Sequence, residues 1–219
     1  MKIDLFFLII KKIYFNFLSR YVNDEIKTFS RHSTYDGYIK KQLEKTADPK
    51  KIQKWKGIEW ETKVNGFRNL FKRNQEFLNN KKKALCLGSR TGQELFVLRE
   101  LGLEAIGIDL VEFLPFTIKG DIHNLIFEDK TFDLIFTNIL DHSLHLEKFI
   151  HEMERVAISG GIIILNYQEN IIGDDYSENI IYNSRPIIEM FKNSRLLRNR
   201  NIKNTFDQMN KELIFEKTY

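Results

Sequence analysis

The stretch from Lys83 to Phe96, which reads KALCLGSRTGQELF, constrains the fold of this 219-residue chain more than any other. A short apolar run stops at Gly88, small hydroxyl residues and a second glycine, Gly92, follow, and an amphipathic run then begins. This order predicts a strand, a tight turn and the start of a helix. Because backbone N–H groups at such a turn can face a bound ligand, the stretch also predicts a ligand site.

Strand-like and helix-like segments alternate downstream of this stretch, and continuous apolar runs among them are typical of buried parallel strands. The predicted strands are 83–87, 104–109, 116–119, 131–137 and 162–165, the predicted helices are 93–101, 146–156 and 187–191, and two further strands, 195–198 and 212–216, are close enough to pair antiparallel. We therefore predict an α/β fold with a doubly wound, mostly parallel, seven-stranded sheet and an antiparallel edge strand.

The chain before the first predicted strand is expected to form an N-terminal helical extension. Five apolar residues recur there at spacings of three, four or seven, namely Trp60, Val64, Phe67, Phe71 and Leu78. This pattern predicts one buried face of a single helix. The segment 34–42 is predicted to form a second, short amphipathic helix. We divide the chain into an extension over 1–80, which serves as a lid or an interface, and a ligand-binding domain over 81–219.

The first eighteen residues are strongly apolar but carry Asp4, Lys11 and Lys12. A spanning helix needs about 20 largely uncharged residues, so these charges argue against a membrane span. The segment favours a helix that packs on the domain or on a second subunit. The alternative is an interfacial helix that places Lys11 and Lys12 near lipid headgroups, which would make the protein peripheral to a membrane.

The composition of the chain argues against several classes of partner and metal site. The formal net charge is only +4 and both signs are mixed along the chain, which argues against nucleic acid as a partner. The single cysteine, Cys86, excludes an internal disulfide and a cysteine-only metal site. A reducing, cytoplasmic setting fits this cysteine usage best.

The residues just after each predicted strand are the candidate ligand contacts, because ligands of such sheets bind beyond the carboxyl ends of the strands. They are Gly88 to Gly92, Asp109, Asp121 to His123, Asn138 to His142 and Tyr167 to Asp175. Asp109 ends the second strand about 20 residues after the glycine turn, the separation expected for an acidic residue that reaches a ribose. These residues are predicted to share one rim of the sheet.

Five motifs along this rim resemble those of class I S-adenosylmethionine-dependent methyltransferases, in particular the type-11-like domains that act on metabolites, lipids or glycans. The motifs are Leu85–Gly92, Ile106–Asp109, Gly120–Phe127, Phe132–Asn138 and Arg155–Gly161. The resemblance covers about Lys83 to Tyr219. It implies a Rossmann-like domain with S-adenosylmethionine as its cofactor.

The resemblance also implies a set of cofactor-binding residues, namely Gly88, Ser89, Arg90, Gly92, Asp109, Asp121, Ile122, His123 and Asn138. In this family the glycines let the backbone approach the methionine part, and a residue at the place of Asp109 accepts hydrogen bonds from the ribose hydroxyls. Asp121 would accept from the adenine amino group and the Ile122 N–H would meet a ring nitrogen. Asn138 would contact the amino-acid end, and His123 is expected to offer its backbone.

Two residues depart from the family pattern. An acidic residue is common where Cys86 stands, and a glycine is common where Arg90 stands. The lost carboxylate removes a usual partner of the loop or of the cofactor's amino end. Arg90 adds a cation that meets the cofactor carboxylate or points to solvent. These departures affect methionine binding more than the fold.

The candidate catalytic residues are His142 and Asp141, which follow the fourth strand. A general base is needed only if the acceptor atom is a hydroxyl or a protonated amine. Together with His145 they also suggest a metal, but a zinc site needs three or four well-placed ligands, so we predict no metal site. A surface-loop role for these side chains is the simpler alternative.

The predicted function is methyl transfer from S-adenosylmethionine to a small-molecule, glycan or lipid-linked acceptor. A non-catalytic binding or scaffold protein is the alternative that Cys86 and Arg90 keep open. A nicotinamide-dependent oxidoreductase is disfavoured because Gly88 to Gly92 lacks the G-x-G-x-x-G spacing. The resemblance implies that the N-terminal extension helps to select the acceptor, so we expect cofactor binding to survive deletion of Met1 to Lys56. The identity of the acceptor and the oligomeric state are not determined by the sequence.

Overall fold

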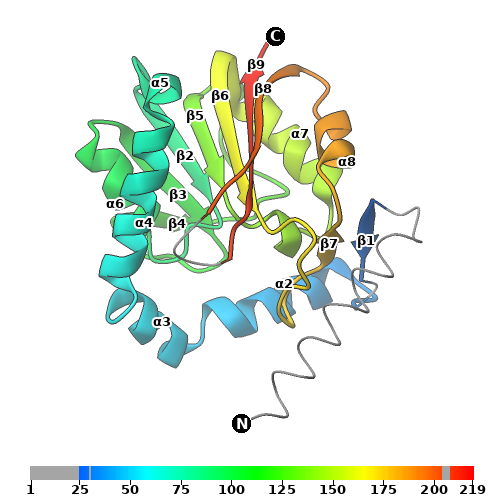
Figure 1. Cartoon of the computed structure of the whole chain (residues 1–219). Coiled ribbons are helices and arrows are strands. Elements are labelled where there is room, and N and C mark those ends of the chain that lie inside the picture. Colours follow the sequence, from blue (N-terminus) through cyan, green and yellow to red (C-terminus); the bar gives the residue numbers. More distant parts are fainter. Residues whose placement is uncertain (1–24, 30, 204–207) are drawn as a thin grey trace.

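A seven-stranded sheet forms the centre of the computed structural model, which describes residues 25–29, 31–203 and 208–219 (Figure 1). Its strand order is β4-β3-β2-β5-β6-β9-β8. The strands are β2 (Lys83–Leu87), β3 (Glu104–Asp109), β4 (Thr117–Lys119), β5 (Phe132–Thr137), β6 (Ala157–Tyr167), β8 (Ser194–Asn201) and β9 (Lys211–Lys217). The interpretations of residues 1–18 fall outside the described residues.

Five of these strands, β4, β3, β2, β5 and β6, run parallel, with β2 at their centre. Leu85 of β2 lies opposite Ile106 on one side and Ile135 on the other. β9 pairs antiparallel with both β6 and β8. The predicted seven-stranded, mostly parallel sheet is therefore confirmed, and the antiparallel strand is β9, one place in from the edge strand β8.

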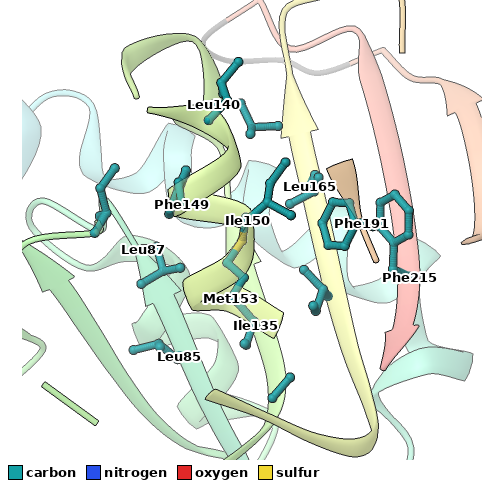
Figure 2. Close-up of a cluster of buried hydrophobic side chains, with 14 of the residues drawn as sticks. Leu85, Leu87, Ile135, Leu140, Phe149, Ile150, Met153, Leu165, Phe191 and Phe215 are labelled. Atoms are coloured by element: carbon teal, nitrogen blue, oxygen red, sulfur yellow. The ribbon is translucent and has the colours of Figure 1, made fainter. Parts of the chain in front are cut away.

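Helices cover both faces of the sheet, as a buried parallel sheet requires (Figure 1). On one face lie α4 (Trp60–Arg73) and α6 (Gln93–Glu100), and on the other α7 (Leu146–Val156) and α8 (Arg185–Met190). Side chains of successive β2 residues point to opposite faces of the sheet. Ala84 and Cys86 belong to the buried hydrophobic cluster under α4 and α6. Leu85 and Leu87 join the cluster under α7, where Phe149, Ile150 and Met153 point at the sheet (Figure 2).

The prediction of a single helix over residues 60–78 is wrong, because the chain breaks at Asn74 and forms two helices, α4 and α5 (Gln75–Leu78). Asn74 is fully buried and its amide donates to Glu212 Oε2 at 2.8 Å. The side-chain oxygen of Asn74, Oδ1, accepts a hydrogen bond from the Arg200 guanidinium at 2.8 Å. These contacts with β8 and β9 are distant in sequence, so helical periodicity alone did not show the break.

Two helices of the N-terminal extension pass over the carboxyl ends of the strands (Figure 1). α2 (Tyr35–Thr46) is longer than predicted and is capped by the Thr34 side chain, which accepts the Gly37 N–H. α3 (Pro49–Lys56) was not predicted. It begins at a proline, and the Asp48 side chain accepts the N–H of Lys50 at 2.8 Å, which are favourable features for a helix start.

A second, two-stranded sheet was also missed. β1 (Ile26–Thr28) pairs antiparallel with β7 (Asn179–Ile181). The strand predicted over 162–165 is also longer than expected, since β6 begins at Ala157 and includes Gly160, which has a φ of 75°. Among the described residues, no helix combines the length and the apolar character needed to cross a membrane.

Candidate functional site

The glycine loop between β2 and α6 can only be built with glycine at two places. Gly88 has a φ of +77°, and a Cβ there would lie 2.4 Å from the Cδ1 of Ile139. Gly92 has a φ of +82°, and a Cβ there would lie 2.5 Å from the Cβ of Phe116. At each position a larger residue would need an unfavourable left-handed backbone conformation and would clash with a neighbouring side chain. The predicted strand, tight turn and helix start are therefore confirmed.

Asp109, at the end of β3, holds this loop in place. Its Oδ2 accepts the N–H of Arg90 at 2.9 Å and its Oδ1 accepts the N–H of Leu110 at 2.7 Å. The side chain is buried, and burial raises the pKa of the Asp109 carboxyl. Each carboxylate oxygen can accept a further hydrogen bond, so Asp109 can bind two hydroxyl groups without leaving the loop.

A hollow lies above the carboxyl ends of β2 and β3 and below α2; we call it the first hollow. The predicted cofactor residues that line it are Gly88, Arg90, Asp109, Asp121 and Ile122, and the others lining it are Tyr38, Ile39, Gln42, Lys45, Thr46, Leu110, Gly120, Ile139 and His142. Five of the nine predicted cofactor residues thus meet at one surface, although they come from three separate loops.

Three predicted residues line neither this hollow nor the one beside it. Ser89 is buried and its hydroxyl lies 2.8 Å from that of Thr117. Gly92 packs on Phe116, as described above. The His123 ring is fully buried and its backbone N–H donates to Asp121 Oδ1 at 2.8 Å. These residues shape the site from beneath and do not form its surface.

Asp121 has partners within the protein that sequence reasoning missed. Its Oδ2 accepts the Tyr35 hydroxyl of α2 at 2.7 Å, and that hydroxyl also lies 2.8 Å from His123 Nδ1. Burial alone would raise the pKa of Asp121, but hydrogen bonds from His123 and Tyr35 outweigh it and lower the pKa to about 2. The helical spacing of Tyr35 and Tyr38 was visible in the sequence, but their partner was not.

A second hollow adjoins the first and has about 600 Å³ of open space. Its charged lining residues are Lys45, Lys51, Lys54, Glu59, Lys63, Arg90, Asp141 and Asp174, and the others are Trp55, Asn138, His142, Gln168, Ile172, Gly173, Ser177, Gln208 and Met209. The predicted residues Asn138, Asp141 and His142 therefore lie here. Lys45, Arg90 and His142 line both hollows, so these three side chains mark the junction.

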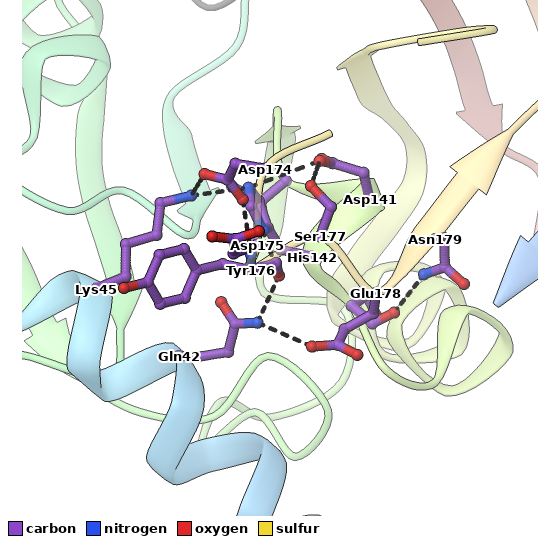
Figure 3. Close-up of polar contacts among 12 residues, drawn as sticks. Gln42, Lys45, Asp141, His142, Asp174, Asp175, Tyr176, Ser177, Glu178 and Asn179 are labelled. Atoms are coloured by element: carbon purple, nitrogen blue, oxygen red, sulfur yellow. Dashed lines mark hydrogen bonds and ion pairs between the residues drawn. The ribbon is translucent and has the colours of Figure 1, made fainter. Parts of the chain in front are cut away.

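The His142 ring is fixed by two contacts at this junction (Figure 3). Its Nδ1 lies 2.9 Å from the carbonyl oxygen of Tyr176, and since a carbonyl only accepts, Nδ1 carries the proton. Nε2 is then the acceptor of neutral His142, and it lies 3.3 Å from the Nζ of Lys45. Lys45 also contacts Asp174 Oδ2 at 2.6 Å. Burial and the neighbouring Arg90 lower the pKa of Lys45.

The segment around Tyr176 holds α2 against the second hollow (Figure 3). Gln42 of α2 donates to the carbonyl oxygen of Tyr176 at 2.8 Å, and Ser177 donates to Asp141 Oδ2 at 2.7 Å. The Nζ of Lys51, in α3, lies 4.5 Å from the centroid of the Tyr176 ring. Across residues 25–29, 31–203 and 208–219, no group of three or more His, Cys, Asp or Glu side chains is placed to hold a metal ion.

Comparison with known proteins gives a family and a fold. The family model described as a methyltransferase domain matches residues 85–165. Among curated proteins, no sequence matches this chain significantly.

Solved structures with the same fold include a Burkholderia thailandensis 1,6-didemethyltoxoflavin-N1-methyltransferase with bound S-adenosylhomocysteine, at 13% identity and a TM-score of 0.66, covering 89% of this chain and 95% of that one. An S-adenosylmethionine-dependent methyltransferase from Aquifex aeolicus is 19% identical with a TM-score of 0.58, covering 78% of this chain and 99% of that one. At these identities the likeness concerns the fold.

Proposed function

The chain is a class I S-adenosylmethionine-dependent methyltransferase by its methyltransferase domain and its fold, and we propose that it methylates a small-molecule, glycan or lipid-linked acceptor bound in the second hollow. The observation that carries this proposal is the junction, where Lys45, Arg90 and His142 line both hollows. A group held in the first hollow and a group held in the second would meet at these side chains.

The residues that line the first hollow suit the adenosine part of the cofactor, although its open space of about 50 Å³ has to widen before an adenosine can enter. Gly88 lines this hollow with its backbone, and the Ile139 side chain, which a Cβ on Gly88 would meet at 2.4 Å, lines it as well. Asp109 can accept from ribose hydroxyls while keeping both backbone N–H donors. Asp121 and Ile122, beyond β4, are the residues we assign to the adenine. S-adenosylmethionine supplies a methyl group on a sulfonium, already activated for in-line displacement.

The second hollow suits the acceptor. Its open space of about 600 Å³ lies in the range of small-molecule sites. Its lining is mostly polar and charged, which favours a polar acceptor over an apolar one. The proposal leaves the partner class at a small molecule, a glycan or a lipid-linked group, and it assigns no nucleic acid partner because the net charge is small.

His142 is the group we assign to proton removal from an acceptor hydroxyl or amine. Its Nδ1–H stays on the Tyr176 carbonyl, which leaves Nε2 to accept the proton. The Nζ of Lys45 lies 3.3 Å from His142 Nε2 and 2.6 Å from Asp174 Oδ2. When the methyl acceptor replaces Lys45 beside Nε2, Lys45 keeps its shorter contact with Asp174. Asp141 Oδ2 lies 3.7 Å from Nε2, where its negative charge favours the imidazolium that forms.

The test is isothermal titration with S-adenosylhomocysteine. We expect Asp109→Ala to weaken binding by about 100-fold or more, because two hydroxyl contacts and the loop anchor are lost. Asp133→Ala is the matched control: Asp133 Oδ2 also accepts two backbone N–H groups, of Lys82 and Lys83, but at the opposite end of the sheet. Equal losses in the two variants, or heat with a nicotinamide dinucleotide alone, would contradict the proposal.

A further inference from the structure

The lining of the second hollow contains more basic than acidic side chains. The bases are Lys45, Lys51, Lys54, Lys63 and Arg90, and the acids are Glu59, Asp141 and Asp174. Two of these acids are already paired with bases of the same hollow. Asp174 contacts Lys45 at 2.6 Å, and Glu59 contacts Lys54 at 2.6 Å. The hollow therefore keeps a surplus of positive charge.

Two of the bases have no acid beside them. Within the part of the chain that the structure describes, neither the Lys51 ammonium nor the Arg90 guanidinium makes a hydrogen bond or an ion pair. Each lies over an aromatic ring, with Lys51 Nζ 4.5 Å from the centroid of Tyr176 and Arg90 Cζ 5.1 Å from that of Trp55. A ring face attracts the cation but leaves N–H donors available, and both side chains are partly exposed. A ligand in the hollow can therefore reach these donors.

Lys45 links these two cations into one cluster. Its Nζ lies 5.1 Å from the Tyr176 ring centroid, so Lys45 and Lys51 approach the same ring (Figure 3). On its other side Lys45 is close enough to Arg90 that this positive charge, together with burial, lowers the pKa of Lys45. A negatively charged group that enters the hollow reduces the repulsion among the three cations.

The position of Lys51 indicates which ligand would bring this negative charge. Lys51 lies in α3 and lines only the second hollow, whereas Lys45 and Arg90 line both hollows. The first hollow is the one that we assign to the adenosine part of the cofactor. A cation that faces only the second hollow is placed to recognise the molecule that fills it, which is the methyl acceptor.

We propose that the methyl acceptor carries an anionic group, a phosphate or a carboxylate, and that Lys51 binds this group in the positive field of Lys45 and Arg90. This inference rests on the proposed function, because it requires the acceptor to occupy the second hollow. It narrows the acceptor from polar molecules in general to negatively charged ones. Lys51 then determines specificity and takes no part in the transfer of the methyl group.

The test uses inorganic pyrophosphate and malonate as probes of the anion site. Each probe is titrated calorimetrically into protein saturated with S-adenosylhomocysteine, so that the place of the cofactor is already filled. We expect wild-type protein to bind at least one of them, with tighter pyrophosphate indicating a phosphate and tighter malonate a carboxylate. Lys51→Gln should weaken the bound probe by about 10-fold, as expected for loss of a charge-assisted hydrogen bond, and change the affinity for S-adenosylhomocysteine by less than about 2-fold.

Lys50→Gln is the matched control, because it makes the same change of charge one residue earlier in α3, at an exposed side chain that lines neither hollow. We expect it to leave the affinity for the probe within about 2-fold of wild type, with thermal melting to verify that each variant is folded. Equal weakening by the two variants, no weakening by Lys51→Gln, or no binding of either probe to the saturated wild-type protein would overturn the inference. Failure of wild-type protein to bind S-adenosylhomocysteine would instead overturn the proposed function, and the inference with it.

Discussion

Glu94 is a buried acid whose ionisation opposes folding. It is 5% exposed in the first turn of α6, and burial raises its pKa from 4.5 to about 8. The unfolded chain releases this proton near pH 4.5 and the native chain near pH 8. The native state therefore binds more protons between these values, and this group lowers stability as the pH rises through that window.

Replacing Glu94 by glutamine removes this dependence. We expect Glu94→Gln to match wild type near pH 4.5 and to be more stable at pH 8 by on the order of 3 kcal/mol. Urea denaturation of both proteins at the two pH values measures the difference. A stability difference between the proteins that is the same at pH 4.5 and pH 8 would show that folding does not raise the pKa of Glu94.

Some residues of the candidate site could be predicted from the sequence and others could not. Gly88 and Asp109 were predicted because both follow apolar strands at a separation that a nucleoside-binding turn requires. Tyr35 and Lys45 were not, because their contacts with Asp121 and Asp174 span 86 and 129 residues. No local pattern encodes a contact of that range.

At the scale of elements, α2 changes what the N-terminal extension is expected to do. From the sequence, deletion of Met1 to Lys56 was expected to leave cofactor affinity largely intact. The structure instead places Tyr38, Gln42 and Lys45 of α2 on the first hollow, opposite the glycine loop. α2 therefore borders the region that we assign to the cofactor.

We now expect a chain that begins after Lys56 to bind S-adenosylhomocysteine at least about 10-fold more weakly, because one wall of the first hollow is removed. α4 and its contacts with the sheet remain in this truncation, so circular dichroism should verify that the core is kept. Unchanged affinity in a folded truncation would show that α2 contributes nothing to cofactor binding and serves only the acceptor.

Helices and strands were predicted correctly where the local pattern of apolar residues determines the secondary structure. The helix predicted over 146–156 is α7, and the strand predicted over 83–87 is β2. Periodicity failed where a distant partner decides, as at Asn74, whose contacts with Glu212 and Arg200 divide one amphipathic run into α4 and α5. β1 and β7 were missed for the same reason, since each is a short strand that exists through the other.

At the scale of the whole molecule, five parallel strands bring their carboxyl ends to one edge of the sheet, and α2 and α3 cross that edge (Figure 1). The two hollows lie between these layers and meet at Lys45, Arg90 and His142. The division into an extension over 1–80 and a domain over 81–219 stays a prediction, although α4 of the extension packs into the core of the domain. The central claim is that the cofactor and the acceptor occupy the two hollows and meet at this junction.

A crystal structure of the complex with S-adenosylhomocysteine tests this claim most directly. The account predicts the ribose on Asp109, the adenine beside Asp121 and Ile122, and the sulfur at the junction facing the second hollow. A nucleoside bound outside the first hollow, or a sulfur that points away from Lys45 and His142, would contradict it.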